Sequence, residues 1–352
     1  MTYVLTRRKN GLAPPSTIGA SRFARFGGAS MSRSILAPVR GALAAVLLVA
    51  NTLWCIVPIL LLTLVKLALP FAPVRRLVDR ALNAVATGWV AINNAVLWDD
   101  RRTTLDVDGL AALSLRDWYM VISNHCSWVD ILVLQRVLNR RVPMLKFFLK
   151  WELIFVPVIG IAWWALDFPF MRRHGKAALR KHPELREKDR DATRRACEKF
   201  SLVPTSVMTF PEGTRLTSAK QTSQGMAYRH LLKPKAGSLA MSLHALGTRF
   251  QSLLDVTIVY PDGVPDFWDF LCGRCPRVLV RVHTRAIAPE LCVGDYTVDT
   301  ALRRDFHRWL DAIWREKDDE IEALLIASAP RALPVSGAAG QAPANGATTR
   351  RG

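Results

Sequence analysis

Acidic residues are missing from the first part of this sequence. No Asp or Glu precedes Asp79, whereas ten Lys and Arg residues do. Over the whole chain, 48 Lys and Arg residues outnumber 29 Asp and Glu residues, which gives a formal net charge of +19. A balance this basic favours an anionic partner, and the two obvious candidates are nucleic acid and the phosphates of a lipid surface.

Cysteines are also few. Six of them are scattered over 352 residues, which excludes the dense disulfide framework of a small secreted domain. Cys272 and Cys275 have the spacing of half a zinc site or of a redox pair, but no second Cys/His pair follows at metal-ligand spacing. We therefore expect reduced thiols and no metal site.

The sequence has no internal repeat, and charged residues make up only 22% of it beside 50% hydrophobic residues. Collagen-like, coiled-coil and wholly disordered chains are thereby excluded. The length of 352 residues fits one large domain or two small ones.

One stretch, residues 41–65, carries no charge and is bounded by Arg40 and Lys66. A helix of this length, about 37 Å, can cross the roughly 30 Å of a bilayer's hydrocarbon core. No small-residue cleavage site follows the stretch, so we expect a retained anchor rather than a signal peptide. Two geometries remain open, because Pro58 could turn a straight span into a re-entrant hairpin.

The chain divides by composition into four expected regions. They are a basic extension at 1–34, a membrane anchor and linker at 35–98, a body at 99–326, and a disordered tail at 327–352 that is rich in Ala, Pro, Gly and Ser. Met31 is an alternative start, which would make the residues before it dispensable. Basic residues flank the anchor on both sides and pull both of its ends to the cytoplasmic face.

The body has the pattern of an α/β domain, because short apolar runs alternate with longer charged helical patterns. The predicted strands are rich in β-branched or aromatic residues and cover residues 118–122, 207–210, 254–260 and 278–283. The predicted helices cover residues 128–138, 183–200 and 236–246.

A polar cluster, residues 123–130, follows the first predicted strand. Ligands bind at the carboxyl ends of strands in such sheets. On one continuous helix His125 and Asp130 would lie about 140° apart, so they can meet only if His125 precedes the helix. The carboxylate would then hold one imidazole nitrogen and leave the other as a general base. The alternative is a surface histidine beside a helix-capping aspartate.

A second cluster, residues 210–215, follows the strand at 207–210. Gly213 relieves the backbone where a turn approaches a ligand, and Arg215 can hold a phosphate with two hydrogen bonds. Glu212 could orient the substrate or the arginine. The alternative is an ordinary Pro-Gly turn with a solvated ion pair.

In this order and spacing, the two clusters resemble the motifs of the lysophospholipid acyltransferase family, which are the 1-acyl-sn-glycerol-3-phosphate acyltransferases. Residues 168–173 are similar to the family's second motif, and residues 232–237 and 255–261 are similar to its fourth. Residues 145–150 and 175–200 resemble the bacterial inner-membrane branch, which is itself similar to lysocardiolipin and lysophosphatidylinositol acyltransferases.

The resemblance implies a glycerol-3-phosphate acyltransferase-like fold, a mixed sheet flanked by helices behind a membrane anchor. It implies acyl transfer from acyl-CoA or acyl-ACP to the free hydroxyl of a lysophospholipid, without a cofactor. His125 would be the general base and Asp130 its partner. The residues implied to bind the substrate are Asn124, Arg172, Arg173, Glu212, Gly213, Thr214 and Arg215. Two departures, Asp167 in place of a glycine and Arg172 in place of an acid or amide, leave the lysophospholipid undefined.

The implied partners are the two substrates, the anionic surface of a bacterial inner membrane and acyl carrier protein, with the catalytic domain facing the cytoplasm and no nucleic acid bound. The basic membrane-facing surface is expected to consist of Lys146, Lys150 and residues 172–176, interleaved with aromatic residues. Two other functions stay open. Water could replace the lipid hydroxyl, which would make the protein a thioesterase or lipid hydrolase, or the protein could be a membrane-tethered scaffold that binds anionic ligands without catalysis.

Overall fold

A computed structural model describes residues 36–99, 102–110, 113–171, 203–294, 296 and 298–329. Several features expected from the sequence lie outside these residues. They are the basic extension at 1–34, the helix at 183–200, Arg172, Arg173 and the tail beyond residue 329.

The centre of the protein is a six-stranded mixed sheet with the strand order β1-β8-β7-β2-β6-β3. All neighbouring strands run parallel except β7 and β8, which are antiparallel. The strands are β1 (Thr104–Asp108), β2 (Tyr119–Ser123), β3 (Leu145–Phe147), β6 (Ser206–Thr209), β7 (Ser252–Val259) and β8 (Arg277–Arg285), while β4 (Leu149–Lys150) and β5 (Phe170–Met171) form a separate parallel pair.

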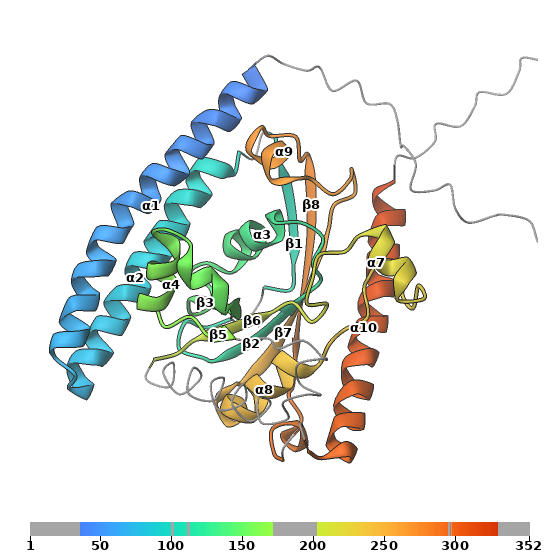
Figure 1. Cartoon of the computed structure of the whole chain (residues 1–352). Helices are drawn as coiled ribbons and strands as arrows, with labels where there is room; N and C mark the ends of the chain where they lie inside the picture. Colours follow the sequence, from blue (N-terminus) through green and yellow to red (C-terminus); the bar gives the residue numbers. More distant parts are fainter. Residues whose placement is uncertain are drawn as a thin grey trace, which may run out of the picture. The chain divides into compact units, whose positions relative to one another are not determined.

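Helices cover both faces of this sheet (Figure 1). The α-helices are α1 (Leu36–Ala68), α2 (Ala72–Leu97), α3 (Val129–Leu138), α4 (Ile159–Ala165), α7 (Ser218–Ser223), α8 (Gly237–Leu246), α9 (Phe267–Leu271) and α10 (Thr300–Ser328). The 3₁₀ turns are η1 (Trp151–Phe155), η2 (Gly247–Arg249) and η3 (Pro289–Leu291).

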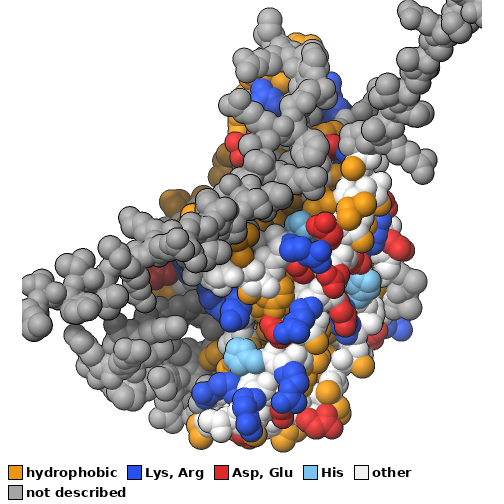
Figure 2. Space-filling model, turned by 90° about the vertical axis from the view of Figure 1, so that its right-hand side faces the viewer, with side chains coloured by type: hydrophobic (Ala, Val, Ile, Leu, Met, Phe, Trp, Pro, Cys, Tyr) orange, Lys and Arg blue, Asp and Glu red, His pale blue; other side chains and the backbone are white. Residues whose placement is uncertain are grey.

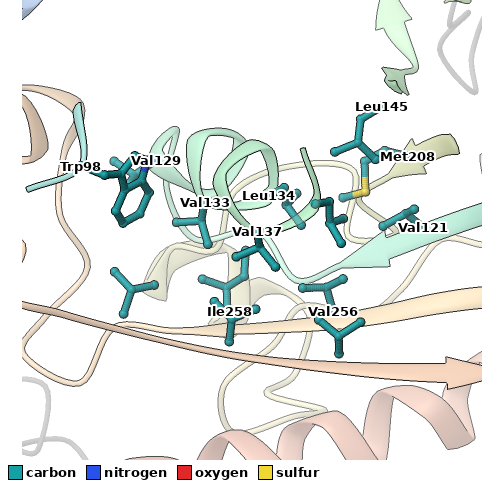
Figure 3. Packing of buried hydrophobic residues seen from close by; sticks show 14 of the residues in the cluster. Trp98, Val121, Val129, Val133, Leu134, Val137, Leu145, Met208, Val256 and Ile258 are labelled. Atoms are coloured by element: carbon teal, nitrogen blue, oxygen red, sulfur yellow. The ribbon is translucent and has the colours of Figure 1, made fainter. Parts of the chain in front are cut away.

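The central strands are apolar throughout because both of their faces are covered. Every residue of β2, β6 and β7 is buried. Alternate residues of β2 enter different cores: Val121 packs with α3, whereas Met120 packs with α8 and α10. Figure 3 shows the first of these cores, in which the apolar face of α3 lies over residues of β2 and β7.

All four predicted strands are present, with ends shifted by one or two residues, and so are the predicted helices at 128–138 and 236–246. The expected mixed sheet is confirmed by the antiparallel pairing of β7 and β8. The sequence analysis did not predict β1 or β3, which are short strands at the two edges of the sheet.

The amino-terminal helix α1 pairs with α2 as an antiparallel hairpin. The Asn51 amide donates to Asn93 Oδ1 at 2.7 Å and to Trp89 O at 3.0 Å. Helix α1 continues through Pro58, and the chain reverses only after Ala68. A re-entrant turn at Pro58 is therefore wrong. By length and composition, α1 is long and apolar enough to cross a membrane.

Charges fix both ends of α1 to the rest of the domain. Arg40 lies 3.7 Å from Asp99 at one end. At the other end, Lys66 pairs with Asp79 at 2.8 Å and also contacts Asp167. These three side chains are almost fully buried, which is possible only because each charge has a partner.

Lys146 does not lie on the surface, which corrects the expectation of a basic membrane-facing residue there. Its side chain is 3% exposed. Burial lowers the pKa of Lys146 to about 8, against the opposing attraction of Asp167 and Asp79. The neighbouring Lys150 is exposed, as expected.

Candidate active site

His125 and Asp130 meet at the end of strand β2. The strand ends at Ser123, His125 lies on the loop that follows, and Asp130 is in the first turn of α3. Nδ1 of His125 is 2.8 Å from Oδ2 of Asp130. The expected contact is thus present, because the loop places the histidine before the helix rather than on it.

The Asp130 carboxylate is completely buried, and four donors surround it. Besides the imidazole, its Oδ2 accepts the backbone N–H groups of Cys126 at 2.7 Å and Ser127 at 2.9 Å. Its Oδ1 accepts the hydroxyl of Tyr260 at 2.7 Å. A buried carboxylate needs such partners, and the start of a helix is a favourable place for negative charge.

The imidazole ring of His125 is fixed on one face by Phe210, the residue after β6. The two rings are stacked with centroids 4.0 Å apart and planes inclined by 14°. The histidine side chain keeps 13% of its surface exposed. Among the described residues, Nε2 has no hydrogen-bond partner, so this nitrogen is available to a ligand at the surface.

Glu212 lies beneath the histidine loop rather than at the surface. It is completely buried, and its two oxygens accept the backbone N–H groups of His125 at 2.9 Å and Leu232 at 3.0 Å. The backbone N–H of Leu216 in turn donates to the carbonyl of His125 at 2.7 Å. Glu212 of the second cluster and Leu216, which directly follows the cluster, therefore hold the N–H and the carbonyl of His125.

Burial also raises the pKa of Glu212 to about 8, although the two backbone N–H groups act in the opposite direction. Desolvation is thus stronger than hydrogen bonding at this carboxyl group. Because Glu212 holds the backbone of the histidine loop, the protonation of this carboxyl group links the attachment of the loop to pH.

Gly213, Thr214 and Arg215 form the surface part of the second cluster. Gly213 has a φ of 69°, which favours glycine in this turn. Arg215 is exposed, and its guanidinium lies 4.9 Å from the centre of the Trp128 ring. Lys220, which the sequence analysis missed, donates to the Thr214 hydroxyl at 2.7 Å. No motif signal marks Lys220, because it reaches this turn from α7.

Asn124 also lies below the surface. Its amide exchanges two hydrogen bonds with the backbone of Ile258 in β7, at 2.8 and 2.9 Å. The side chain therefore fastens the histidine loop to the neighbouring strand. Arg172 and Arg173 lie outside the described residues, so the structure does not place them.

Tyr260 is a second residue to which the sequence analysis assigned no role, although it lies in the stretch 255–261 that resembles the fourth motif. It directly follows β7, which runs parallel to β2 and is paired with it. The signal that could have found it is its position, because the carboxyl ends of parallel strands meet at one edge of the sheet. His125, Phe210 and Tyr260 all come from this edge.

Residues 105–261, which hold this whole arrangement, match the protein-family model described as Acyltransferase. These residues, a little less than half of the chain, are similar to the acyltransferase family. The match covers both polar clusters and the ends of β2, β6 and β7.

Curated relatives of the acyltransferase domain share part of their length with it. The 2-acyl-1-lysophosphatidylinositol acyltransferase of Saccharomyces cerevisiae is 31% identical over 136 residues, which are 34% of this chain and 32% of the yeast protein. The probable 1-acyl-sn-glycerol-3-phosphate acyltransferase 5 of Arabidopsis thaliana is 28% identical over 215 residues, 57% of this chain and 52% of its own. The chain thus spans about a third of the yeast protein and about half of the Arabidopsis protein.

Among solved structures, the chain is similar to the 1-acyl-sn-glycerophosphate (LPA) acyltransferase PlsC from Thermotoga maritima. The TM-score is 0.38 and the identity 17%, over 79% of this chain and 97% of the other.

A Glu212→Gln substitution tests the buried carboxyl group. Because its pKa is about 8 in the folded chain and about 4.5 unfolded, the folded state binds an extra proton between these values. The contribution of Glu212 to the free energy of unfolding is therefore complete below pH 4.5 and falls by up to about 1.4 kcal/mol per pH unit as pH rises to 8. We expect the thermal midpoint of the glutamine variant to lack this decline relative to the unmodified protein.

The measurement is thermal unfolding of the full chain in detergent at pH 5 to 8. Glu290→Gln, at an exposed position, serves as the control and should leave the pH dependence unchanged. The prediction would be contradicted if the thermal midpoints of the unmodified protein and of Glu212→Gln differed by the same amount at every pH in this range.

Proposed function

We propose that this protein is a membrane-bound acyltransferase. It moves a fatty acyl group from an acyl thioester, carried by coenzyme A or acyl carrier protein, to the free hydroxyl of a lysophospholipid such as 1-acyl-glycerol-3-phosphate. The observation that carries the proposal is the His125–Asp130 contact, held at a partly exposed edge of the sheet inside an acyltransferase-family domain. The relatives' names, which are those of lysophosphatidylinositol and 1-acyl-sn-glycerol-3-phosphate acyltransferases, support a lysophospholipid acceptor.

His125 is the general base of this reaction. Its Nδ1–H donates to Asp130, so Nε2 carries the lone pair that accepts the proton of the lipid hydroxyl. The deprotonated oxygen attacks the thioester carbonyl, the C–S bond breaks, and the imidazolium returns its proton to the leaving thiolate. The lipid hydroxyl supplies the nucleophile, so the reaction needs no acyl-enzyme intermediate and no cofactor.

The surface turn after β6 binds the phosphate of the acceptor. Arg215 is exposed beside the histidine loop, and its contact with the Trp128 ring limits the directions in which it can point. Gly213 and Thr214 belong to the same turn, and Arg172 and Arg173 complete this site in the proposal. Asn124 and Glu212, whose side chains bind backbone groups, position the loop instead of touching the lipid.

The outer face of α1 anchors the protein in the membrane. That face is apolar and exposed, and Phe155, Ile161 and Trp164 of the η1–α4 segment add further exposed apolar side chains. The opposite side of the molecule differs. Figure 2 shows the face that carries α10, where basic and acidic side chains are interspersed. This difference orients α1 toward lipid and α10 toward water.

Both ends of α1 are bound by charges to the same domain, so we place both on one side of the membrane. We propose that this membrane is the bacterial inner membrane and that the active site faces the cytoplasm. The basic flanks of α1 support that orientation.

Replacing His125 with Ala tests the proposed mechanism. Loss of the general base should lower the rate of acyl transfer by about 10² to 10⁴-fold. The measurement is mass spectrometry of the lipids formed when membranes that carry the protein receive a panel of lysolipids with acyl-CoA or acyl-ACP. Cys126→Ala is the matched control, because it removes the adjacent thiol from the same loop and should retain activity.

The same samples distinguish transfer from hydrolysis when thiol release is followed with and without lysophospholipid. An acyltransferase releases thiol mainly when the acceptor is present, whereas a thioesterase does so without it. Unchanged product formation by His125→Ala would overturn the mechanism, and so would acceptor-independent thiol release.

Replacing Arg215 with Gln tests the phosphate site. Loss of a charged contact worth about 1.4 kcal/mol corresponds to a tenfold rise in KM for 1-acyl-glycerol-3-phosphate. The KM for the acyl thioester should stay unchanged. Arg308→Gln, at an exposed position on α10, is the control. An equal rise in both KM values would show that Arg215 does not act on the acceptor.

Introducing negative charges on the apolar outer face of α1 tests the membrane anchor. Trp54 and Leu61 are 78% and 60% exposed on this helix, and each glutamate placed in a bilayer core costs about 2.5 kcal/mol or more. We expect Trp54→Glu with Leu61→Glu to lower the fraction of protein recovered with membranes at least about tenfold. Val293→Glu with Val298→Glu, at two exposed valines outside α1, should have no effect. Equal recovery of both double variants would contradict the anchor.

A further inference from the structure

We propose that Tyr260 is a positioning residue that tunes the proton affinity of the His125–Asp130 pair through its hydroxyl. This inference rests on the proposed function, in which His125 is the base. It assigns a role to a residue that lies outside both polar clusters and enters the site from the end of β7.

The geometry makes Tyr260 the donor to one specific oxygen. The hydroxyl donates to Oδ1 of Asp130 at 2.7 Å, whereas the imidazole and two backbone N–H groups all contact Oδ2. Asp130 is completely buried, and Tyr260 is 6% exposed. Water therefore cannot readily replace the phenol as the donor to Oδ1.

A hydrogen bond to Oδ1 draws negative charge away from the oxygen that faces the imidazole. It thereby weakens the stabilisation that Asp130 gives to a protonated His125. Burial and the neighbouring Asp130 charge raise the pKa of Tyr260 well above its usual range, so the hydroxyl remains protonated and remains a donor. Removing it leaves a more basic carboxylate behind the histidine. The imidazole then keeps its proton up to a higher pH.

Other titratable groups also face this pair. Cys126 lies on the same loop, Glu212 enters from the loop after β6, and Cys275 lies near Tyr260. Lys317 of α10 interacts with Glu212, and Arg215 lies over Trp128 at the surface. A change confined to the Tyr260 hydroxyl leaves all of these groups in place.

The rival explanation is a purely structural tyrosine, because its ring also packs in the core around α3. Tyr228 offers a matched control for this explanation. It is buried to the same extent, and its hydroxyl also donates to an aspartate, Asp311 of α10. Tyr228→Phe removes an equivalent hydrogen bond that has no contact with the active site.

The experiment measures kcat/KM of the full chain as a function of pH for the unmodified protein, Tyr260→Phe and Tyr228→Phe. Activity falls on the acid side where the base becomes protonated. We expect Tyr260→Phe to move the midpoint of this fall upward by about half a pH unit or more. Tyr228→Phe should leave the midpoint unchanged, even if both variants unfold at lower temperature.

A second measurement covers the case in which Tyr260→Phe does not fold. Incorporation of 3-fluorotyrosine at position 260 keeps the ring and the hydroxyl but makes the hydroxyl a stronger donor, so the midpoint should move downward. A midpoint equal to that of the unmodified protein, in whichever Tyr260 form folds, would overturn the proposal. If His125→Ala keeps its activity, the proposed role of His125 as the base fails, whereas an inactive His125→Ala with unmoved midpoints refutes only the role of Tyr260.

Discussion

The buried carboxylate of Asp130 is the interaction on which the rest of the site depends. It is completely buried at the start of α3, and it accepts hydrogen bonds from the histidine loop and from Tyr260 at the end of β7. Removing a negative charge from solvent is costly unless such donors surround it. The requirement to satisfy this one group therefore fixes the histidine loop and the start of α3 against the end of β7, which lies 130 residues further along the chain.

The parallel strands β2, β6 and β7 provide the frame for this arrangement. Their carboxyl ends lie at one edge of the sheet, and each contributes a side chain in contact with the pair or with its ring. Backbone hydrogen bonds then lock the loops together, since Glu212 binds the N–H of His125 and Leu216 binds its carbonyl. A reactive imidazole is thereby held in one orientation before any ligand arrives.

Sequence reasoning succeeded where the determining signal is local. Apolar runs rich in β-branched or aromatic residues predicted β2, β6, β7 and β8 to within two residues. A contact between His125 and Asp130, five residues apart, required the loop that the structure contains. It did not succeed where the partner is distant. The backbone role of Glu212 depends on a residue 87 positions away, and the burial of Lys146 depends on acidic side chains that other segments bring beside it. The type of a residue does not show which distant residues will surround it in the fold.

The paired charges at the ends of α1 have a consequence for attempts to obtain a water-soluble enzyme. Deleting the helix would remove its apolar surface, but it would also take away the Lys66 ammonium and leave Lys146 alone to balance the two carboxylates of Asp79 and Asp167. An uncompensated carboxylate in an apolar interior typically costs about 3 to 5 kcal/mol, a large part of the stability of an ordinary domain. A shortened chain would thus lose stability as well as its anchor, unless the same variant also replaced both aspartates with uncharged residues.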